Sequence, residues 1–528
     1  MRPRLGVNRR LKSPPPPPTL TAGVGPSMLE ILLSPASPAE LDADLLALAV
    51  PDAELAAREL TRRLDARLDG LLQRAAADER FRGKPGQTLI AHATGLGARR
   101  IALVGVGPSG ESPTARLRAA AGTAIRLAAS VGATRVGLTW DGMEIPTPEA
   151  VAAAAEGAWL GAYRFDKYLT DERNRPPSVG AFTLLVPGGD AAIAEAAPAL
   201  ARARTTARAV ARARDLVNEP AGVMTPSRIA AVAGEWSAAP ATDGLALEVL
   251  DRAACTKLGM GLYLAVAQGS TEEPRFVHLA WTPPGAKRRV VLVGKGVTFD
   301  SGGLSLKTNE GMLDMKTDMA GAASVLAAAT AAAEEKLPVE VHALAACTEN
   351  MPSGSSYKLG DVLRSLAGKT VEINNTDAEG RLTLADALSF GMRFKPDAVL
   401  DFATLTGACV VALGPHTAGV MSNDDALANA FLDAASRAGE EMWRLPLPPR
   451  LGEQLKSEIA DLKNTGERWG GALTAGLFLK EFVGDVPWVH VDIAGPSSAS
   501  KELGHVGKGG TGFAVASILE YLRRVAAA

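Results

Sequence analysis

Charged side chains crowd into the stretch NNTDAEGRLTLADAL, residues 374–388, where Asp377, Glu379 and Arg381 stand at alternate positions. In an extended segment, residues i, i+2 and i+4 point to the same side, so these three groups are expected to face a single point. Two carboxylates at one point repel each other unless a cation lies between them. The spacing therefore predicts a cation-binding centre just before a buried helix.

Further ligands for such a centre stand in VGKGVTFDSGGLSLKTNEGMLDMKTDMAGAASV, residues 293–325, which contains Lys295, Asp300, Lys307 and Asp318. Asp300 follows a predicted strand, and two glycines after it allow the backbone to turn tightly. Asp318 opens an Ala-rich helix, where a carboxylate also suits the helix dipole. Taken singly, each acid fits an N-cap or a turn.

Together, four carboxylates at three chain locations predict a dinuclear cage for hard or borderline divalent ions. The six histidines are dispersed and no H-E-x-x-H motif occurs, so a metal site here has to be built mainly from carboxylates.

These acids are positioned by alternating apolar runs and Ala-rich helices, a pattern that predicts an α/β protein. Runs suited to buried strands stand at 99–107, 133–140 and 180–188, and again at 288–296, 339–347, 397–407 and 487–495. The polar clusters follow such runs, which is where sheets covered on both faces bind ligands. The expected domains are a smaller N-terminal α/β domain at 28–195, a connecting helix at 196–220, and a C-terminal domain at 221–528.

The composition of the chain restricts the partners and the location that can be expected. Lys and Arg number 56 against 58 Asp and Glu, so no global charge indicates nucleic acid or an anionic membrane. Three scattered cysteines and the lack of an apolar run of about 18 residues favour a cytoplasmic protein without a transmembrane helix. Residues 1–27 are basic, acid-free and carry five consecutive prolines, which favours a disordered tail or an over-extended start, with a transit peptide as the alternative.

Two glycine-rich stretches imitate phosphate-binding loops. GVGPSG, with Gly105, Gly107 and Gly110, lacks the acid expected about 20 residues further on, so a plain strand-to-helix turn is favoured. VGKG lacks the Ser or Thr that should follow Lys295 in a P-loop, and that interpretation fails.

Several ordered motifs resemble the M17 family of leucyl aminopeptidases, which are cytosolic dinuclear zinc exopeptidases. The motif NTDAEGRL (375–382) is similar to the signature of that family. It is supported by VGKGVTFDSGGLSLK (293–307), MKTDMAGAA (315–323), DFATLTGACVVALG (401–414) and EIADLKNTG (458–466), with LGAYRFDKY (160–168) as a looser N-terminal echo. The resemblance implies a macro-like N-terminal domain and a C-terminal α/β/α sandwich with a mixed sheet.

The resemblance also implies roles for individual residues. Asp300 and Glu379 would bridge two divalent metal ions (Zn or Mn, with Co or Mg possible in the exchangeable site), Lys295 and Asp318 would complete the tighter site, and Asp377 would serve the other. Lys307 would face the scissile carbonyl, and Arg381 would anchor a bicarbonate ion that acts as general base. The first side chain of the peptide would be surrounded by Met315, Thr404, Leu405, Gly407 and Ala494.

The implied activity is release of N-terminal leucine and other apolar residues from peptides by a homohexamer arranged as a dimer of trimers. Two alternatives stay open at this point. One is a binding or scaffolding protein that keeps the fold, since some relatives also bind DNA, although nucleic acid is not the expected partner here. The other is a different dinuclear metallohydrolase, such as an amidase.

Overall fold

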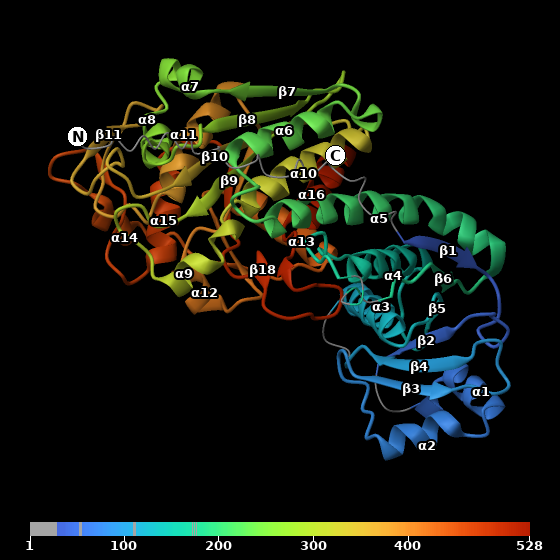
Figure 1. Cartoon of the computed structure of the whole chain (residues 1–528). Coiled ribbons are helices and arrows are strands. Elements are labelled where there is room, and N and C mark those ends of the chain that lie inside the picture. The colour runs from blue at the N-terminus through green and yellow to red at the C-terminus, as the bar shows by residue number, and fades with distance from the viewer. Residues whose placement is uncertain (1–28, 52–54, 109–111, 172, 174, 176) are drawn as a thin grey trace, which may run out of the picture.

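Two β-sheets organise the chain, and a long helix runs between the domains that contain them (Figure 1). The computed structural model describes residues 29–51, 55–108, 112–171, 173, 175 and 177–528. The predicted tail, residues 1–27, lies outside these described residues.

The N-terminal sheet has six strands in the order β1-β6-β5-β2-β4-β3, and only the edge strand β3 runs antiparallel to its neighbour. Side chains alternate along the strands, and both faces are buried. One face packs against α3, α4 and α5, and the other packs against α1 and α2. The strands are β1 (Glu30–Ser34), β2 (Leu45–Val50), β3 (Thr88–His92), β4 (Arg100–Gly105), β5 (Arg135–Trp140) and β6 (Ala181–Leu185). The helices are α1 (Glu59–Arg67), α2 (Leu71–Asp78), α3 (Pro113–Ser130) and α4 (Thr147–Ala162).

The C-terminal sheet is mixed and has eight strands in the order β15-β14-β17-β13-β9-β10-β8-β7. Its central strands β17, β13, β9 and β10 are parallel, which brings their carboxyl ends to one edge of the sheet. Helices α10, α13 and α16 belong to the core on one face, and α8, α11 and α15 belong to the core on the other. The strands are β7 (Leu245–Leu250), β8 (Arg275–Trp281), β9 (Arg289–Asp300), β10 (Glu340–Asn350), β13 (Ala398–Ala403), β14 (Ala418–Ser422), β15 (Met442–Arg444) and β17 (Trp488–Asp492). The helices are α8 (Gly261–Val266), α10 (Ala320–Glu334), α11 (Gly380–Gly391), α13 (Asp425–Ala438), α15 (Gly471–Lys480) and α16 (Val515–Ala527).

Helix α5 (Gly189–Asn218) packs against α4 of the first domain and α10 of the second (Figure 1). It begins before the connecting helix expected at 196–220 and contains Pro198, and it ends just before Pro220. The predicted α/β class, with a mixed sheet covered on both faces in the C-terminal half, is confirmed. The domain boundaries at 28, 195 and 220 stay predictions.

In the described part of the chain, no helix combines the length and apolarity needed to cross a membrane.

Candidate metal centre

The four acids predicted from the sequence come from three elements that meet at the carboxyl edge of the large sheet. Asp300 is the last residue of β9, and Asp318 lies two residues before α10. Asp377 and Glu379 precede α11, with Glu379 at its N-cap. Because β9 is central and parallel to both of its neighbours, its end is a natural ligand position.

Asp300, Asp377 and Glu379 each offer a carboxylate oxygen, and these oxygens lie within 4.8 Å of one another. The predicted extended conformation of the 374–381 segment is wrong, however. Residues 374–379 form a bend and a turn rather than an extended strand, and Glu379 already has helical dihedral angles, φ −73° and ψ −35°. The acids therefore converge because a turn leads into a helix, and not because alternate residues share a face.

Two lysines lie between the carboxylates. The Nζ atom of Lys295 is 2.7 Å from Asp318 Oδ1 and 2.8 Å from Glu379 Oε1. The Nζ atom of Lys307 is 2.9 Å from Asp300 Oδ2 and 2.5 Å from Asp377 Oδ1. The site thus joins two lysine ammonium groups to four acids, and both lysines occupy positions that the sequence predicted.

Burial and repulsion perturb these groups strongly. Burial raises the pKa of Asp318 and of Glu379, and the neighbouring carboxylates raise both further. Burial alone would lower the pKa of Lys295, but the charges of Asp318, Glu379 and Asp300 outweigh it and raise this pKa. A lysine that ligates a metal has to be neutral, so metal binding at Lys295 has to be coupled to the release of its proton.

Unpartnered atoms show that the cage has capacity for a cation. Asp318 Oδ2 and Glu379 Oε2 are buried and accept no hydrogen bond from the described residues. Burying a carboxylate oxygen without a hydrogen-bond donor costs free energy, and a divalent cation bound by that oxygen removes this cost. The protein groups therefore fit the dinuclear site that the resemblance implies.

Two glycines allow this close packing. A Cβ atom on Gly380 would lie 2.5 Å from Lys295 Cε, so a side chain there would displace the end of the lysine where it passes the start of α11. Gly302 has φ +85°, and a Cβ there would lie 2.9 Å from Asp377 Oδ1. A side chain at either position would disturb this packing.

Three supporting residues were not predicted from the sequence. Asn350, at the end of β10, donates from Nδ2 to Asp300 Oδ1 at 2.8 Å and to the carbonyl of Thr376 at 3.0 Å. Tyr357 donates its hydroxyl to the same carbonyl at 2.8 Å. Asn464 accepts from the backbone N–H of Asn374 at 2.9 Å and donates to the carbonyl of Asn375 at 2.6 Å. They fix the turn that carries Asp377, and the register that pairs Asn350 with Asp300 could only come from the fold.

Arg381 lies in the first turn of α11 and is buried. Its Nη1 donates to the carbonyl of Asn464 at 2.8 Å, while its Nε has no acceptor among the described residues. Burial lowers the pKa of Arg381 to about 10, against the charges of Glu379 and Asp492. An unpartnered guanidinium donor beside the carboxylate cage fits a small planar anion.

Of the residues predicted around the substrate side chain, Thr404 contacts the cage directly. Thr404 accepts at its carbonyl from Lys295 Nζ at 3.1 Å, and its hydroxyl donates to Asp318 at 2.7 Å. Leu405 follows directly, and Gly407 begins α12 (Gly407–Leu413). Met315 begins the 3-10 helix η5 (Met315–Thr317), and Asp318 is the C-cap residue of this helix. Ala494 lies just beyond β17, and its N–H shares the Asp492 carboxylate with Leu405.

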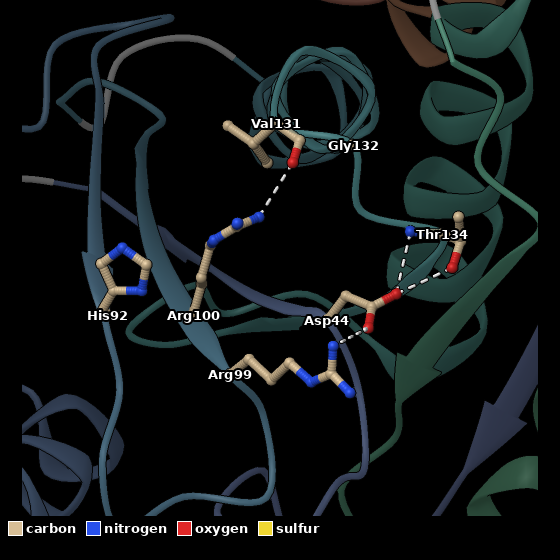
Figure 2. Close-up of a pocket in the computed structure, with 7 residues that line it drawn as sticks. All are labelled: Asp44, His92, Arg99, Arg100, Val131, Gly132 and Thr134. Carbon is tan, nitrogen blue, oxygen red and sulfur yellow. Dashed lines mark hydrogen bonds and ion pairs between the residues drawn. The ribbon is translucent and has the colours of Figure 1, made fainter.

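A separate pocket of about 400 Å³ opens in the N-terminal domain, at the start of β4 and the end of α3 (Figure 2). Its wall includes His92, Arg99 and Arg100, but Asp44 lies near Arg99 as an opposing charge and the Val131 carbonyl at the end of α3 accepts a hydrogen bond from Arg100. None of the predicted site residues lines it.

The first phosphate-loop look-alike has a packing role. A Cβ on Gly105 would lie 2.3 Å from the Lys84 carbonyl oxygen, and one on Gly107 would lie 2.7 Å from the Pro85 ring. These two glycines let the turn after β4 approach residues 83–85. Residues 109 and 110 of the motif lie outside the described residues.

With the site described, comparison with known proteins decides the family. The profile of the cytosol aminopeptidase family, catalytic domain, matches residues 211–519, and that of its N-terminal domain matches residues 48–172. The chain belongs to the cytosol aminopeptidase family. The resemblance drawn from the motifs is thereby confirmed, and family membership implies aminopeptidase activity.

Relatives in this family match almost the whole chain. A probable cytosol aminopeptidase of Geobacter sp. (strain M21) is 45% identical over 462 residues, which are 87% of this chain and 93% of that protein. One from Synechococcus sp. (strain JA-3-3Ab) is 46% identical over 470 residues, 87% of this chain and 91% of that protein.

Solved structures agree with this assignment. A point mutant of tomato leucine aminopeptidase has a TM-score of 0.86 and 35% identity, covering 95% of this chain and 97% of that one. The bottromycin maturation enzyme BotP in complex with Mn has a TM-score of 0.80 and 39% identity, covering 92% of this chain and 100% of that one.

Proposed function

We propose that this chain is a metal-dependent aminopeptidase that releases N-terminal leucine and other apolar residues from peptides. The observation that carries the proposal is the cage, buried except at Asp377, in which four carboxylates crowd around Lys295 and Lys307 and two carboxylate oxygens lack any donor among the described residues. Family membership supports the peptidase activity.

Two metal ions would be held by Lys295, Asp300, Asp318, Asp377 and Glu379. Divalent cations in such a site polarise a carbonyl group and lower the pKa of a nearby water. BotP binds Mn, and Zn or Mn are the ions we propose here, with Co or Mg in the more exchangeable position.

Lys307 would stabilise the oxygen of the scissile carbonyl as negative charge develops on it. Burial would lower the pKa of Lys307, but Asp300 and Asp377 raise it, so the side chain carries a positive charge. A preorganised cation in a partly buried site stabilises a developing oxyanion by several kcal/mol.

Arg381 would hold a bicarbonate ion. Bicarbonate would serve as the general base for the water, because no side chain is suitably placed for that role. The free Nε of Arg381 supports this role. The guanidinium is kept in place by its bond to the Asn464 carbonyl, so its remaining donors are oriented before an anion arrives.

Leucine preference rests on the character of the residues beside the cage. Met315, Leu405, Gly407 and Ala494 are small or apolar, and the hydroxyl of Thr404 is engaged by Asp318. A charged substrate side chain would find no partner among them. The homohexamer and the cytoplasmic location stay predictions from the resemblance.

The proposal is tested by comparing leucinamide, a leucyl dipeptide and N-acetyl-leucinamide as substrates for the metal-loaded protein. Release of leucine from the first two, with no cleavage of the acetylated compound, is expected because a free α-amine can bind the site and an acylated one cannot. Equal cleavage of the acetylated compound would favour a general amidase. Cleavage of none of the three would favour a binding or scaffolding protein.

A further inference from the structure

Asp492, the last residue of β17, is a buried acid that the mechanism above does not use. Its Oδ1 accepts from the N–H of Leu405 at 3.1 Å, of Thr406 at 3.4 Å and of Ala494 at 3.2 Å. Its Oδ2 accepts from the Thr406 hydroxyl at 2.7 Å. A single carboxylate thus receives four donors from two separate segments.

These two segments are the ones placed beside the substrate. The first follows β13 and carries Thr404, Leu405 and Gly407, and the second follows β17 and carries Ala494. Strands β13 and β17 are parallel neighbours, with Ala403 opposite Asp492, so both segments leave the sheet at the same edge. The Ile493 N–H donates to the Ala403 carbonyl at 2.8 Å where the two segments leave the sheet. Beyond that pair, no backbone hydrogen bond of the described residues joins Leu405 or Thr406 to residues 494–495, and the Asp492 carboxylate links them instead.

The tethered segment also contacts the metal cage. Thr404 lies one residue before Leu405, and it binds both Lys295 and Asp318. Asp492 therefore fixes one end of a short peptide whose other end contacts two proposed ligands. Movement of this peptide would change the distance between the walls of the side-chain pocket and the cage.

The surrounding charges keep Asp492 in place. Burial raises the pKa of Asp492, and the charge of His490 together with the hydrogen bonds from the Thr406 hydroxyl and the Ala494 and Leu405 N–H groups opposes that rise. His490 is itself held by Asp401, with Nδ1 2.6 Å from Asp401 Oδ1. His490 and the hydrogen-bond donors together offset the cost of burying the Asp492 carboxylate.

We propose that Asp492 is a positioning residue that sets substrate selectivity by tying the 404–407 segment to Ala494. The inference rests on the proposed function, because it assumes that these segments surround the first side chain of the peptide. It adds a residue that neither touches the substrate nor binds metal.

The test compares Asp492→Ala with Asp492→Asn on leucyl and alanyl p-nitroanilides, using metal-loaded protein. The Asn side chain keeps an amide oxygen for the three N–H donors, whereas Ala removes every acceptor. Misplaced pocket walls lose the contribution of the extra methylene groups of leucine, typically worth about 10–200-fold. The ratio of kcat/KM for the leucyl to the alanyl substrate is expected to fall at least about tenfold in Asp492→Ala and to stay within about threefold of wild type in Asp492→Asn.

Asp386→Ala is the matched control. Asp386, on α11, is equally buried and accepts from the N–H groups of Tyr263 at 2.9 Å and Leu366 at 2.7 Å, and neither of these two segments carries a residue proposed to bind metal or substrate. Asp386→Ala should lower Tm as Asp492→Ala does, yet leave the selectivity ratio unchanged. Metal content should match wild type in all three variants.

A separate variant covers the case in which Asp492→Ala does not fold. Thr406→Val removes the bond to Oδ2 while leaving the charge, and a fall of about threefold in the same ratio is expected. An unchanged ratio in Asp492→Ala or Thr406→Val, or an equal fall in Asp492→Ala and Asp386→Ala, would overturn the proposal. So would an equal fall in Asp492→Asn and Asp492→Ala. If the wild type itself fails to release leucine, the proposed function fails first, and the two failures are distinct.

Discussion

Gly380→Ala probes the close packing between α11 and Lys295 most directly. An added Cβ would lie 2.5 Å from Lys295 Cε and 2.8 Å from its Nζ. Carbon atoms in contact lie about 3.5–4.0 Å apart, so the end of the lysine has to move by about 1 Å. Its Nζ lies only 2.7 Å from Asp318 and 2.8 Å from Glu379, which means that this shift disturbs both pairs.

The effect on folding should be small. The atoms in conflict belong to the end of a flexible side chain, and overpacking of this kind costs about 1–3 kcal/mol. Replacing glycine by alanine within a helix stabilises the fold by about 0.5–1 kcal/mol, which offsets part of this cost. Catalysis should respond far more strongly, because a misplacement of about 1 Å in a catalytic site can lower the rate about 10²-fold.

The assay is metal content after gel filtration together with kcat for a leucyl p-nitroanilide, with Tm as the measure of folding. Gly234→Ala is the matched control, because Gly234 lies within α6 (Pro226–Ser237) and an added Cβ there meets only Leu247 Cδ2 at 3.6 Å. We expect weaker metal retention and about a hundredfold lower kcat in Gly380→Ala alone. Full metal content and full kcat would refute the role given to Lys295.

Four further outcomes are expected. Asp318→Asn and Glu379→Gln should each bind less metal and lose most activity but keep the circular dichroism spectrum of the wild type; unchanged metal stoichiometry in both variants would refute the ligand assignment. Arg381→Lys should keep its metal yet lose about 10²–10⁴-fold in kcat and respond only weakly to bicarbonate after degassing, because lysine lacks the planar fork of arginine; equal bicarbonate responses would leave Arg381 a structural role. Burial lowers the pKa of His278 and of His342, whose rings are hydrogen bonded at 2.9 Å, so both favour the neutral form in the fold. Their stabilising contribution is therefore present above the unfolded pKa of about 6.5 and lost as pH falls below it. The free energy of unfolding from urea denaturation between pH 8 and pH 5 should therefore depend less on pH in His342→Phe, whose ring can still stack on Phe394. The same pH dependence in both proteins would contradict this role of the two histidines. A chain that starts at Met28 should match the full chain in oligomeric state and specific activity, and a substantial loss of either would show that residues 1–27 contribute.

The sheet interior could be predicted from the sequence because buried parallel strands are continuous apolar runs. The runs at 288–296 and 339–347 correspond to β9 and β10, although β9 extends four residues further to Asp300. Strands β7 and β8 do not follow from the quoted runs. In β7 only Leu245 is fully buried, so this edge strand carries no continuous apolar signal.

The charged members of the site could also be predicted, because a cage of like charges is conspicuous in any sequence. Its uncharged supports could not. Asn350 reaches Asp300 only because β9 and β10 pair in a register that includes an irregularity between Thr348 and Glu349. Asp492 carried a signal that sequence reasoning missed, since an acid within the apolar run VHVDIAG is out of place unless something binds it.

The geometry of 374–381 shows where pattern reasoning reached a right result for a wrong reason. Alternation in a strand predicts that Asp377, Glu379 and Arg381 share one face, whereas a turn and the start of a helix bring the two acids to Asp300. Arg381 instead donates to the carbonyl of Asn464, a contact that depends on a segment 83 residues away.

The most direct test of the account is a metal titration of chelator-treated protein, followed by calorimetry and by hydrolysis of a leucyl p-nitroanilide. A two-metal centre predicts no hydrolysis by the stripped protein and a rise in activity with added Mn²⁺ or Zn²⁺ that reaches its plateau at two equivalents per chain. Full activity after complete removal of metal, or a plateau at a single equivalent, would contradict it.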